Sequence, residues 1–345
     1  MALDFALSPD QDAIADAFGG FFANESPVEV VRAAEPLGFD PQLWSKLRDM
    51  EAPSMAAPES AGGGGADLGA LAVVAETMGA ALAPVPLIEH WVASIAHPVA
   101  EVVDGSHLAG LAVRPAVDGV WRLVPGGAVA DWVVGVDGDE LVAVASPPPM
   151  DAPANHASAP IADRSARDGE RVVLGPASDH DMLLDRWRVL TASALIGVAD
   201  RAMAIGVDYV MEREQFGRLV GSFQSVQHGL ADLPPLIDGA RFLVHKAAWA
   251  HDEGLTGGRG LIDMDEGNVT EFAPLAAMAL VQAGEAAAVS SDRSLHYHGG
   301  YGFSLEYDIQ LYFRRARGWA NILGDPARER LRIADLLWGT TGGEG

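Results

Sequence analysis

The chain contains no cysteine, and this absence removes several kinds of site at once. None of its 345 residues is a cysteine. Zinc-thiolate centres, iron–sulfur clusters and thiol nucleophiles all need the cysteine sulfur, so the chain can form none of them. Disulfide bonds are excluded as well, which fits a reducing compartment. A chain of this length can bury a large core without such cross-links.

Basic residues are few compared with acidic ones. The chain has 23 Lys and Arg against 48 Asp and Glu, which gives a formal net charge of −25. A surface of this sign repels nucleic acid and anionic membranes, so we expect neither as a partner. We expect no membrane-spanning run, and the N-terminal segment lacks the basic region of a signal peptide. The sequence therefore predicts a cytoplasmic protein.

Three stretches of different character follow one another along the chain. The first begins with a helix start at Ser8 and Pro9 and continues as helices broken by loops. The second consists of short β-branched runs with a hairpin turn at Asp137-Gly138, and the third returns to long helical patterns. The sequence predicts an α+β protein with an N-terminal helical domain, a small middle β domain and a C-terminal helical bundle. These domains are residues 1–104, 105–185 and 186–345.

The third stretch predicts long helices with two interruptions. Apolar residues recur at helical spacing from Leu190 to Tyr209, and Phe216-Gly217 is expected to end this helix. Pro234-Pro235 forces a kink or a break farther on. The acidic segment 251–268 is expected to loop out between helices, and its sequence indicates no function.

The segment HYHGGYGF, residues 296–303, combines two histidines with paired glycines. His296 and His298 are too few ligands for zinc, and neither an HExxH motif nor a second ligand cluster lies near them in the sequence. We therefore expect no metal site. A phosphate loop of the Walker or Rossmann type is also excluded, because these glycines follow a helix rather than a strand.

Two longer motifs place this segment in a context. MEREQFGRLVGSFQSVQHGLADL (211–233) has the pattern R-x-x-F-G…F-Q-x-x-Q…L-A-D, and HYHGGYGFSLEYDIQLYFRRAR (296–317) has the pattern H-G-G-x-G…E-Y…R-x-A-R. In this order and spacing, the two patterns resemble the acyl-CoA dehydrogenase family. LGALAVVAETMGAALAPVPLIEH resembles the family's second helical segment. The resemblance implies that family's fold, with a shortened middle β domain.

The resemblance also implies a site for flavin adenine dinucleotide (FAD) that is shared across a subunit interface. Arg213 would hold the diphosphate, because a guanidinium can donate two parallel hydrogen bonds to it. The other implied contacts to the dinucleotide are Phe216, Phe223, Gln224, His296, Gly299 and Gly300. Without the resemblance, Arg213 would be interpreted as an ion pair with Glu212 or Glu214, and the two glycines as a helix C-cap.

Family members remove the α-proton of an acyl-CoA thioester with a glutamate, and this sequence lacks a glutamate at both positions that the family uses. One position precedes Gly324 and holds Leu323, and the other precedes Arg188 and holds Trp187. Neither side chain can accept a proton. Arg188 and Gly324 match the family, which implies that they line the substrate pocket.

The middle domain shows a parallel loss. In the family it carries a Thr-Glu-Pro turn, a Gly-Ser-Asp loop and a Trp-Ile-Thr strand that hold the isoalloxazine ring. LAVRPAVDG and ADWVVGVDG contain none of these three motifs. A chain that keeps the cross-subunit contacts but lacks the ring cradle and the base is incomplete by itself.

Three interpretations follow. The first is a subunit of a heteromeric FAD-dependent acyl-CoA dehydrogenase, inactive alone, which resembles the short subunits of the α2β2 actinobacterial enzymes that desaturate steroid side-chain thioesters. A paralogous partner would bring the catalytic Glu, a bulky acyl-CoA would be the substrate, and an acceptor like electron-transfer flavoprotein would take the electrons. The second is a complete homomeric enzyme that uses Asp185, Asp325 or Glu306 as its base. The third is a scaffold that binds neither flavin nor acyl-CoA.

Overall fold

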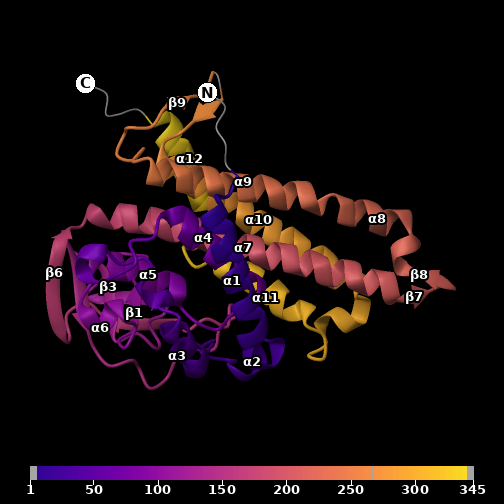
Figure 1. Ribbon diagram of the computed structural model, residues 1–345, viewed down its shortest axis with the longest axis horizontal. Helices are drawn as coiled ribbons and strands as arrows, with labels where there is room; N and C mark the ends of the chain where they lie inside the picture. The colour runs from indigo at the N-terminus through magenta and orange to yellow at the C-terminus, as the bar shows by residue number, and fades with distance from the viewer. Residues whose placement is uncertain (1–5, 266, 340–345) are drawn as a thin grey trace. The chain divides into compact units, whose positions relative to one another are not determined.

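The computed structural model describes residues 6–265 and 267–339 (Figure 1). The chain divides into two compact units, each built from segments that are separate in sequence. The first unit consists of Met1–Phe22, Ala72–Leu82 and Arg188–Gly345, and the second of Ala23–Leu71 and Ala83–Trp187.

Helices supply most of the first unit. Three of them extend past its boundaries: α1 (Pro9–Glu25), α4 (Leu68–Ala80) and α7 (Asp179–Glu212). The others are α8 (Gln224–Ala231), α9 (Leu233–Asp252), α10 (Phe272–Tyr297), α11 (Ile309–Ala320) and α12 (Pro326–Trp338). Short elements connect them: β7 (Glu214–Gln215), β8 (Arg218–Leu219), η3 (Val220–Ser222), β9 (Ile262–Asp263), β10 (Asn268–Val269) and η4 (Gly299–Phe303).

Small residues allow the helices of the first unit to pack closely. Helix α10 packs against α9, α11 and α12, and buries a long row of alanines together with Leu275 and Leu280. A Cβ added at Gly79 of α4 would lie 1.9 Å from the carbonyl oxygen of Ala194 of α7, and one at Gly197 would lie 2.0 Å from that of Glu76. Only glycine fits at these two positions, because the two helix backbones touch there.

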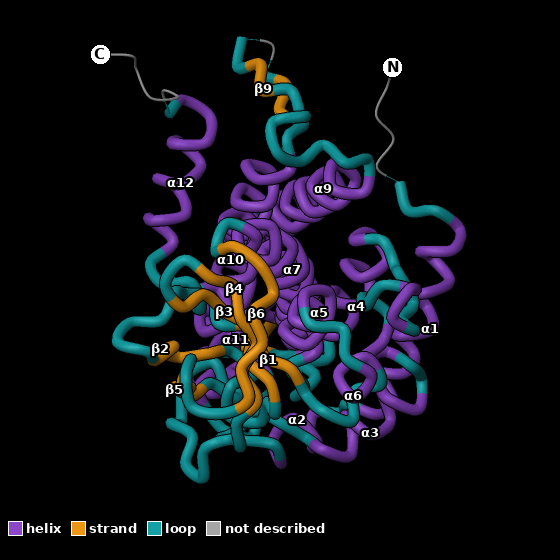
Figure 2. Tube along the Cα trace, turned by 90° about the vertical axis from the view of Figure 1, so that its left-hand side faces the viewer, coloured by secondary structure: helices purple, strands orange, loops and turns teal. Residues whose placement is uncertain are grey.

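The second unit contains the β domain, whose strands are orange in Figure 2. Its helices are α2 (Val28–Ala33), α3 (Pro41–Asp49), α5 (Leu87–Ala96) and α6 (Ala100–Val103), with short 3-10 turns η1 (Ala52–Ser54) and η2 (Glu59–Ala61). Its strands are β1 (Ala109–Leu111), β2 (Val120–Val124), β3 (Trp132–Asp137), β4 (Glu140–Ala145), β5 (Ala162–Ser165) and β6 (Glu170–Pro176). Four strands form a sheet in the order β1-β3-β4-β6, with β1 parallel to β3, and β2 pairs with β5 separately.

The α+β class predicted from the sequence is confirmed, with local corrections. Asp137 pairs with Glu140, so the hairpin turn is Gly138-Asp139, one residue later than predicted. Phe216-Gly217 does not end α7, which stops at Glu212, but forms the turn between β7 and β8. Pro234-Pro235 lies in the first turn of α9, where proline fits, and marks the break predicted there. The acidic segment 251–268 begins in the last turn of α9 and otherwise lies between α9 and α10 as predicted, and its last part forms the hairpin β9–β10, which ends at Val269. The domain boundaries at 104 and 185 stay a prediction.

In the described part of the chain, two helices are long and apolar enough to cross a membrane when judged by length and composition alone. They are α7 and α10, with mean hydropathies of 1.4 and 1.5 over their most apolar windows. Within the protein, 72% and 56% of these windows are buried. Both helices therefore match the core helices of a folded bundle, which are apolar for the same physical reason.

Candidate functional site

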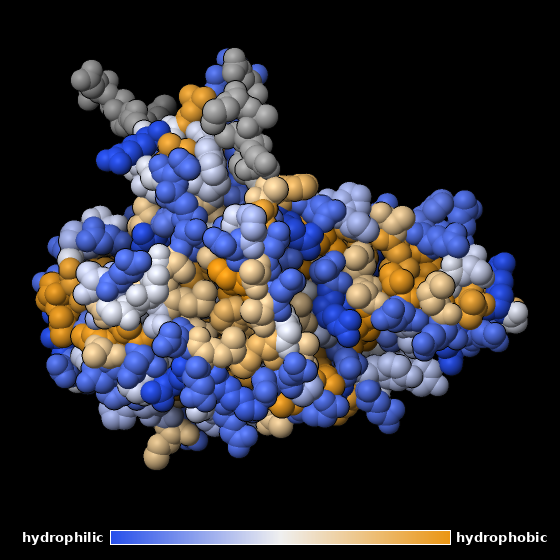
Figure 3. Space-filling view, in the orientation of Figure 1, coloured by the Kyte–Doolittle hydropathy of each residue, from blue (hydrophilic) through white to orange (hydrophobic). Residues whose placement is uncertain are grey.

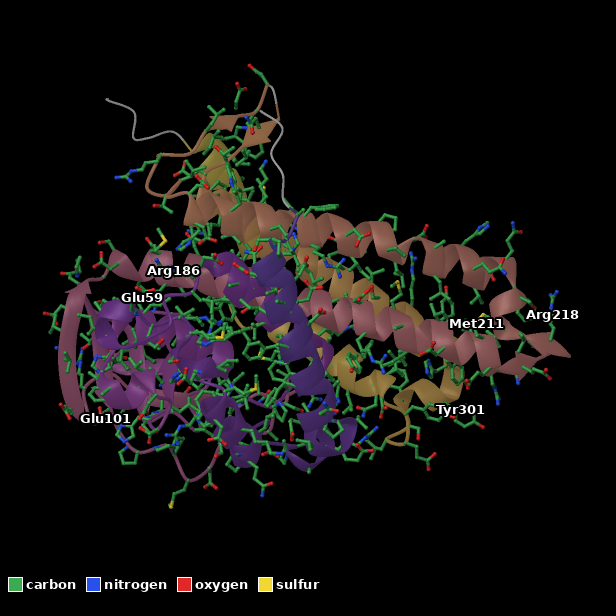
Figure 4. All side chains as sticks on the ribbon, viewed as in Figure 1. Glu59, Glu101, Arg186, Met211, Arg218 and Tyr301 are labelled. Carbon is green, nitrogen blue, oxygen red and sulfur yellow. The ribbon has the colours of Figure 1, made fainter. Side chains whose placement is uncertain are left out.

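Most of the residues that the sequence assigned to FAD come together at one end of the first unit. This bundle end consists of the last turn of α7, the hairpin β7–β8, the start of α8 and the segment from the end of α10 through η4. Figure 4 shows Met211, Arg218 and Tyr301 at this end. Hydrophobic and hydrophilic residues are interspersed on its surface, at the right of Figure 3.

Arg213 lies at the bundle end, where its side chain contacts the ring of Tyr301. Its guanidinium carbon is 5.4 Å from the centroid of the Tyr301 ring, within the range of a cation–π contact. The backbone of Arg213 is fixed as well, because its N–H donates to Tyr209 and its carbonyl accepts from Val220. Among the described residues, Arg213 forms no ion pair with Glu212, Glu214 or any other carboxylate. The ion-pair alternative is therefore wrong, and the guanidinium donors remain available.

Phe216 is a large apolar residue of the site that is almost fully exposed. Its side chain is 94% exposed, and its backbone has a φ of 55°. A bulky side chain in this left-handed region costs about 1 to 2 kcal/mol. Its ring meets that of Phe223 edge to face, with centroids 6.3 Å apart. An exposed aromatic ring on a strained backbone is typical of a contact with another molecule.

The two histidines of the opening motif have different environments. His296 is exposed, whereas His298 is buried and stacks on Tyr209 with the ring centroids 3.9 Å apart. The Nδ1 atom of His298 lies 2.7 Å from the carbonyl oxygen of Ser294, and burial lowers the pKa of this histidine. Because a carbonyl oxygen can only accept, the Nδ1 atom of His298 carries a proton and donates to it. No group of three His, Asp or Glu side chains in the described chain is placed to hold a metal ion.

The glycines of the motif leave room beside the backbone. Gly299 follows α10 with a φ of 63°, which agrees with the C-cap interpretation. A Cβ added at Gly299 or Gly300 would meet no atom within 4 Å, so both face open space. Gly302, in contrast, packs against the carbonyl of Leu295. Gln224, at the start of α8, is exposed.

At the two positions that the sequence assigned to the family's base, neither side chain can accept a proton, and one of them donates an internal hydrogen bond. Trp187, in the second unit, is 1% exposed, and its Nε1 donates to Oε1 of Glu89 at 3.1 Å. Burial raises the pKa of Glu89, and the bond from Trp187 opposes that shift. Leu323, in the first unit, lines a hollow of about 260 Å³ between α10, α11 and α12, together with Gly324.

Arg188 was expected to line the substrate pocket, and an internal carboxylate holds it. Its Nε and Nη2 donate to the two oxygens of Glu329 at 2.8 and 3.1 Å. The side chains are only 6% and 13% exposed, so this is a buried bidentate pair within the first unit.

The carboxylates considered as substitute bases have other environments. The Asp325 side chain caps α12 by accepting from the N–H of Ala327, and Glu306 is exposed at the bundle end. Asp185 is buried in the second unit.

The sequence reasoning missed two polar residues of the second unit. Glu89 is one, although a lone carboxylate in the apolar helix LIEHWVASIA was a usable signal. The other is Arg164 of β5, whose Nη1 donates to the carbonyls of Gly127 and Ala130 at 2.7 Å each, while Nη2 donates to Ser146. No local motif marks an arginine that bonds to backbone so far away in sequence.

The comparisons with known proteins agree with this geometry. The model of the acyl-CoA dehydrogenase N-terminal domain matches residues 8–102, and that of the C-terminal domain matches residues 181–337. Acyl-CoA dehydrogenase IpdE2 of Mycolicibacterium smegmatis is 32% identical over 341 residues, which cover 94% of this chain and 98% of the relative. The chain belongs to the acyl-CoA dehydrogenase family. Members of this family are FAD-dependent oxidoreductases.

Solved structures of two-chain enzymes are among the similar folds. A chain of the Tcur3481-Tcur3483 steroid acyl-CoA dehydrogenase, solved as its G363A variant, has a TM-score of 0.79 and 27% identity, covering 95% of this chain and 97% of that one. A chain of the ChsE4-ChsE5 complex from Mycobacterium tuberculosis has a TM-score of 0.84 and covers 99% and 100%, at 24% identity, which supports the fold alone.

The two units fit FAD to different degrees. In the first unit, the available guanidinium of Arg213 and the open space at Gly299 and Gly300 suit a diphosphate that approaches the backbone closely. In the second unit, LAVRPAVDG (111–119) and ADWVVGVDG (130–138) lack the motifs with which the family holds the flavin ring, and Arg164 is engaged by the carbonyls of Gly127 and Ala130. The residues present fit the dinucleotide end of FAD and do not fit its ring.

Proposed function

We propose that this chain is a subunit of a heteromeric FAD-dependent acyl-CoA dehydrogenase and is inactive alone. In this proposal, the bundle end completes an FAD site that a partner chain begins. One observation carries the proposal. At one end of the first unit, Arg213, which forms no ion pair with a described carboxylate, lies with the exposed, strained Phe216.

Each side chain of the bundle end has a role in this proposal. Arg213 donates hydrogen bonds to the diphosphate, and Phe216 packs against the adenine end. Phe223, Gln224 and His296 lie beside the dinucleotide. Gly299 and Gly300 allow its close approach, because a side chain there would fill the open space. When bound, FAD supplies the acceptor for the β-hydride of the substrate.

The proposal assigns the catalytic Glu to the partner. At the two family positions this chain has Trp187, bonded to Glu89, and Leu323, and neither can accept a proton. Arg188 and Gly324 would then be parts of a pocket wall, with Arg188 held by Glu329. Proton removal on one side of a shared site and cofactor binding on the other would make both chains necessary.

The partner and substrate are proposed by likeness to relatives. Two similar structures are complexes of paired chains, which supports a paralogous partner in an α2β2 assembly. One of them is called a steroid acyl-CoA dehydrogenase, so we propose a bulky steroid side-chain CoA thioester as the substrate. An acceptor like electron-transfer flavoprotein would take the electrons, and the assembly would work in the cytoplasm.

The test is to purify the chain alone and together with its partner, and to add an acyl-CoA to each sample. The proposal predicts bound flavin that bleaches in the co-purified complex, and neither flavin nor bleaching in the chain alone. Arg213→Ala should lower the flavin content of the complex. A lone chain that holds one flavin per protomer and bleaches would contradict the proposal.

A second candidate is a complete homomeric dehydrogenase with an unusually placed base, and Glu89 favours it. This carboxylate has a raised pKa, and it accepts a hydrogen bond from Trp187, which stands at one of the family's base positions. A raised pKa suits a carboxylate that removes a proton near neutral pH. Glu89→Gln should then abolish bleaching of a lone chain that binds flavin, whereas the first proposal predicts no bleaching of the lone chain in either form.

A further inference from the structure

A second arginine at the bundle end has the same kind of environment as Arg213. The guanidinium carbon of Arg218, in β8, lies 4.0 Å from the centroid of the Phe223 ring. Arg218 is exposed, and within the described residues it forms no ion pair. Two arginines at one end of the unit are thus each held by an aromatic ring and left without a carboxylate partner.

This arrangement is unexpected in so acidic a chain. Acidic side chains outnumber basic ones by about two to one, with 48 against 23. Arginines elsewhere in the first unit, such as Arg188, Arg241 and Arg317, pair with carboxylates. Glu212 and Glu214 lie beside Arg213 in sequence, yet neither bonds to either free arginine. Contacts with rings instead of carboxylates keep the guanidinium donors available for an anion from outside.

The backbone of the β7–β8 hairpin fixes the position of Arg218. Gln215 pairs with Arg218, so Phe216-Gly217 is a two-residue turn. Both turn residues have positive φ, 55° and 78°, as a type I′ turn requires. Gly217 adopts this conformation freely, whereas Phe216 is strained, which means that the tight turn is kept despite its cost. The ring of Phe216 and the guanidinium of Arg218 both contact the ring of Phe223.

We propose that Arg218 is a second anion-binding residue of the dinucleotide site, and that Tyr301 and Phe223 are positioning residues that hold the two guanidiniums. The inference rests on the proposed function. The ligand class is a diphosphate that carries an aromatic base. The two guanidiniums can donate hydrogen bonds to the diphosphate, and the exposed rings can stack on the base. Holding each arginine on a ring lowers the side-chain entropy that is lost when the anion binds.

The buttress behind Tyr301 supports the positioning role. The Tyr301 ring lies 5.5 Å from that of Tyr307, and Tyr307 meets His298 edge to face at 5.8 Å. His298 in turn stacks on Tyr209 of α7, the residue whose carbonyl accepts the N–H of Arg213. The chain of rings therefore links Tyr301 of η4 to Tyr209 of α7, which accepts the backbone N–H of Arg213, and it supports both partners of the cation–π contact.

Arg218 is tested by FAD and ADP binding to the assembled complex of this chain and its partner. Arg218→Gln removes the charge, and we expect FAD and ADP each to bind about tenfold more weakly. Arg218→Lys keeps the charge and loses the planar fork, so it should fall between wild type and Arg218→Gln. The control is Arg328→Gln, which removes one exposed arginine from α12 of the same unit and should leave both affinities unchanged.

Tyr301 is tested by rescue with a conservative ring. Tyr301→Leu removes the cation–π contact, and the affinity for ADP should fall about threefold. Tyr301→Phe keeps the ring and should bind ADP like wild type, which a role in hydrogen bonding would not allow. The matched control is Phe242→Leu, which removes an exposed ring from α9 and should leave the affinity for ADP unchanged.

The outcomes separate this inference from the function on which it rests. If Arg213→Ala weakens FAD binding while Arg218→Gln binds like wild type, the second arginine is refuted and the shared FAD site stands. If neither substitution changes FAD binding, the shared site itself is refuted. A Tyr301→Phe variant as weak as Tyr301→Leu would refute the positioning role.

Discussion

The bundle end of the first unit and the β domain of the second unit use arginine in opposite ways. Arg213 and Arg218 lie on aromatic rings and have no carboxylate partner in the described chain. Arg164 is buried and donates to the carbonyls of Gly127 and Ala130 and to Ser146. The same side chain is available to an outside anion in one place and fully engaged within the fold in the other.

This difference indicates which part of the protein meets another molecule. A polar group that the fold itself satisfies contributes to stability, whereas one held in place and left available contributes to binding. The bundle end combines such groups with a strained, exposed Phe216. In the β domain, the turn 125–130 is closed from inside by hydrogen bonds from Arg164. Substitutions should therefore affect stability in the β domain and binding at the bundle end.

Replacing Arg164 should have the largest effect on stability. Arg164→Met leaves buried carbonyls without a donor, and we expect the free energy of unfolding to fall by about 3 to 5 kcal/mol. Arg167→Met is the control, because it breaks an exposed ion pair with Asp137 that solvent screens, so it should change stability little. Urea denaturation measures both. A similar small loss in the two variants would show that Arg164 does not hold the turn.

Breaking the Arg188–Glu329 pair should have the next largest effect. Glu329→Ala leaves a buried guanidinium without its bidentate partner, so unfolding should become easier by about 3 kcal/mol. Glu285→Ala, which removes the exposed 3.7 Å contact with Arg330, should change stability by less than about 1 kcal/mol. Thermal denaturation of the two variants measures both changes in stability. If Glu329→Ala is as stable as Glu285→Ala, Arg188 has enough other partners and is not held by Glu329.

Replacing Arg213 should reverse the pattern seen for Arg164. Arg213→Ala removes a guanidinium that no carboxylate holds, so the stability of the chain should stay within about 0.5 kcal/mol of wild type. FAD binding to the complex should weaken tenfold or more, about 1.4 kcal/mol or above, because charge-assisted hydrogen bonds to the diphosphate are lost. Flavin fluorescence titration and urea denaturation measure the two quantities. Lost stability with intact FAD binding would reverse the roles assigned to the two regions.

Glu89 should give the smallest effect, visible in the pH dependence of stability. Burial raises the pKa of this carboxyl above its ordinary 4.5, so the folded chain holds the proton more tightly than the unfolded chain. The free energy of unfolding therefore falls as the pH rises from about 4.5 through the folded pKa. Glu89→Gln cannot ionise, yet its amide oxygen can still accept from Trp187. Unfolding at pH 4 and pH 8 should show a smaller fall for Glu89→Gln than for wild type, and equal falls would mean that Glu89 is not desolvated.

The sequence was informative where function depends on a local pattern, and less so where it depends on distant contacts. The pattern around Arg213 and the glycines at 299 and 300 appears as two contiguous motifs, and these residues do lie at one end of the first unit. His296 and His298 look equivalent in sequence, but only the fold shows that one is exposed and the other buried. Helix periodicity predicted the α+β class for the same reason, since it depends on neighbours along the chain.

Other features could not be predicted because their partners lie far apart in the chain. Arg188 was assigned to a pocket wall, and its partner Glu329 is 141 residues away. Trp187 and Glu89 are 98 residues apart, and Arg164 bonds to a turn more than 30 residues before it. The turn at Phe216-Gly217 was mistaken for a helix end because glycine serves in both. The ring contacts of Arg218 likewise become visible only in three dimensions.

The measurement that tests the account most directly is the number of flavins per chain in the complex of this protein with its partner, beside the same count for the chain alone. The account predicts fewer flavins than chains in the complex and none in the lone chain, because the bundle end completes a site that another chain begins. One flavin per protomer in the lone chain would contradict it.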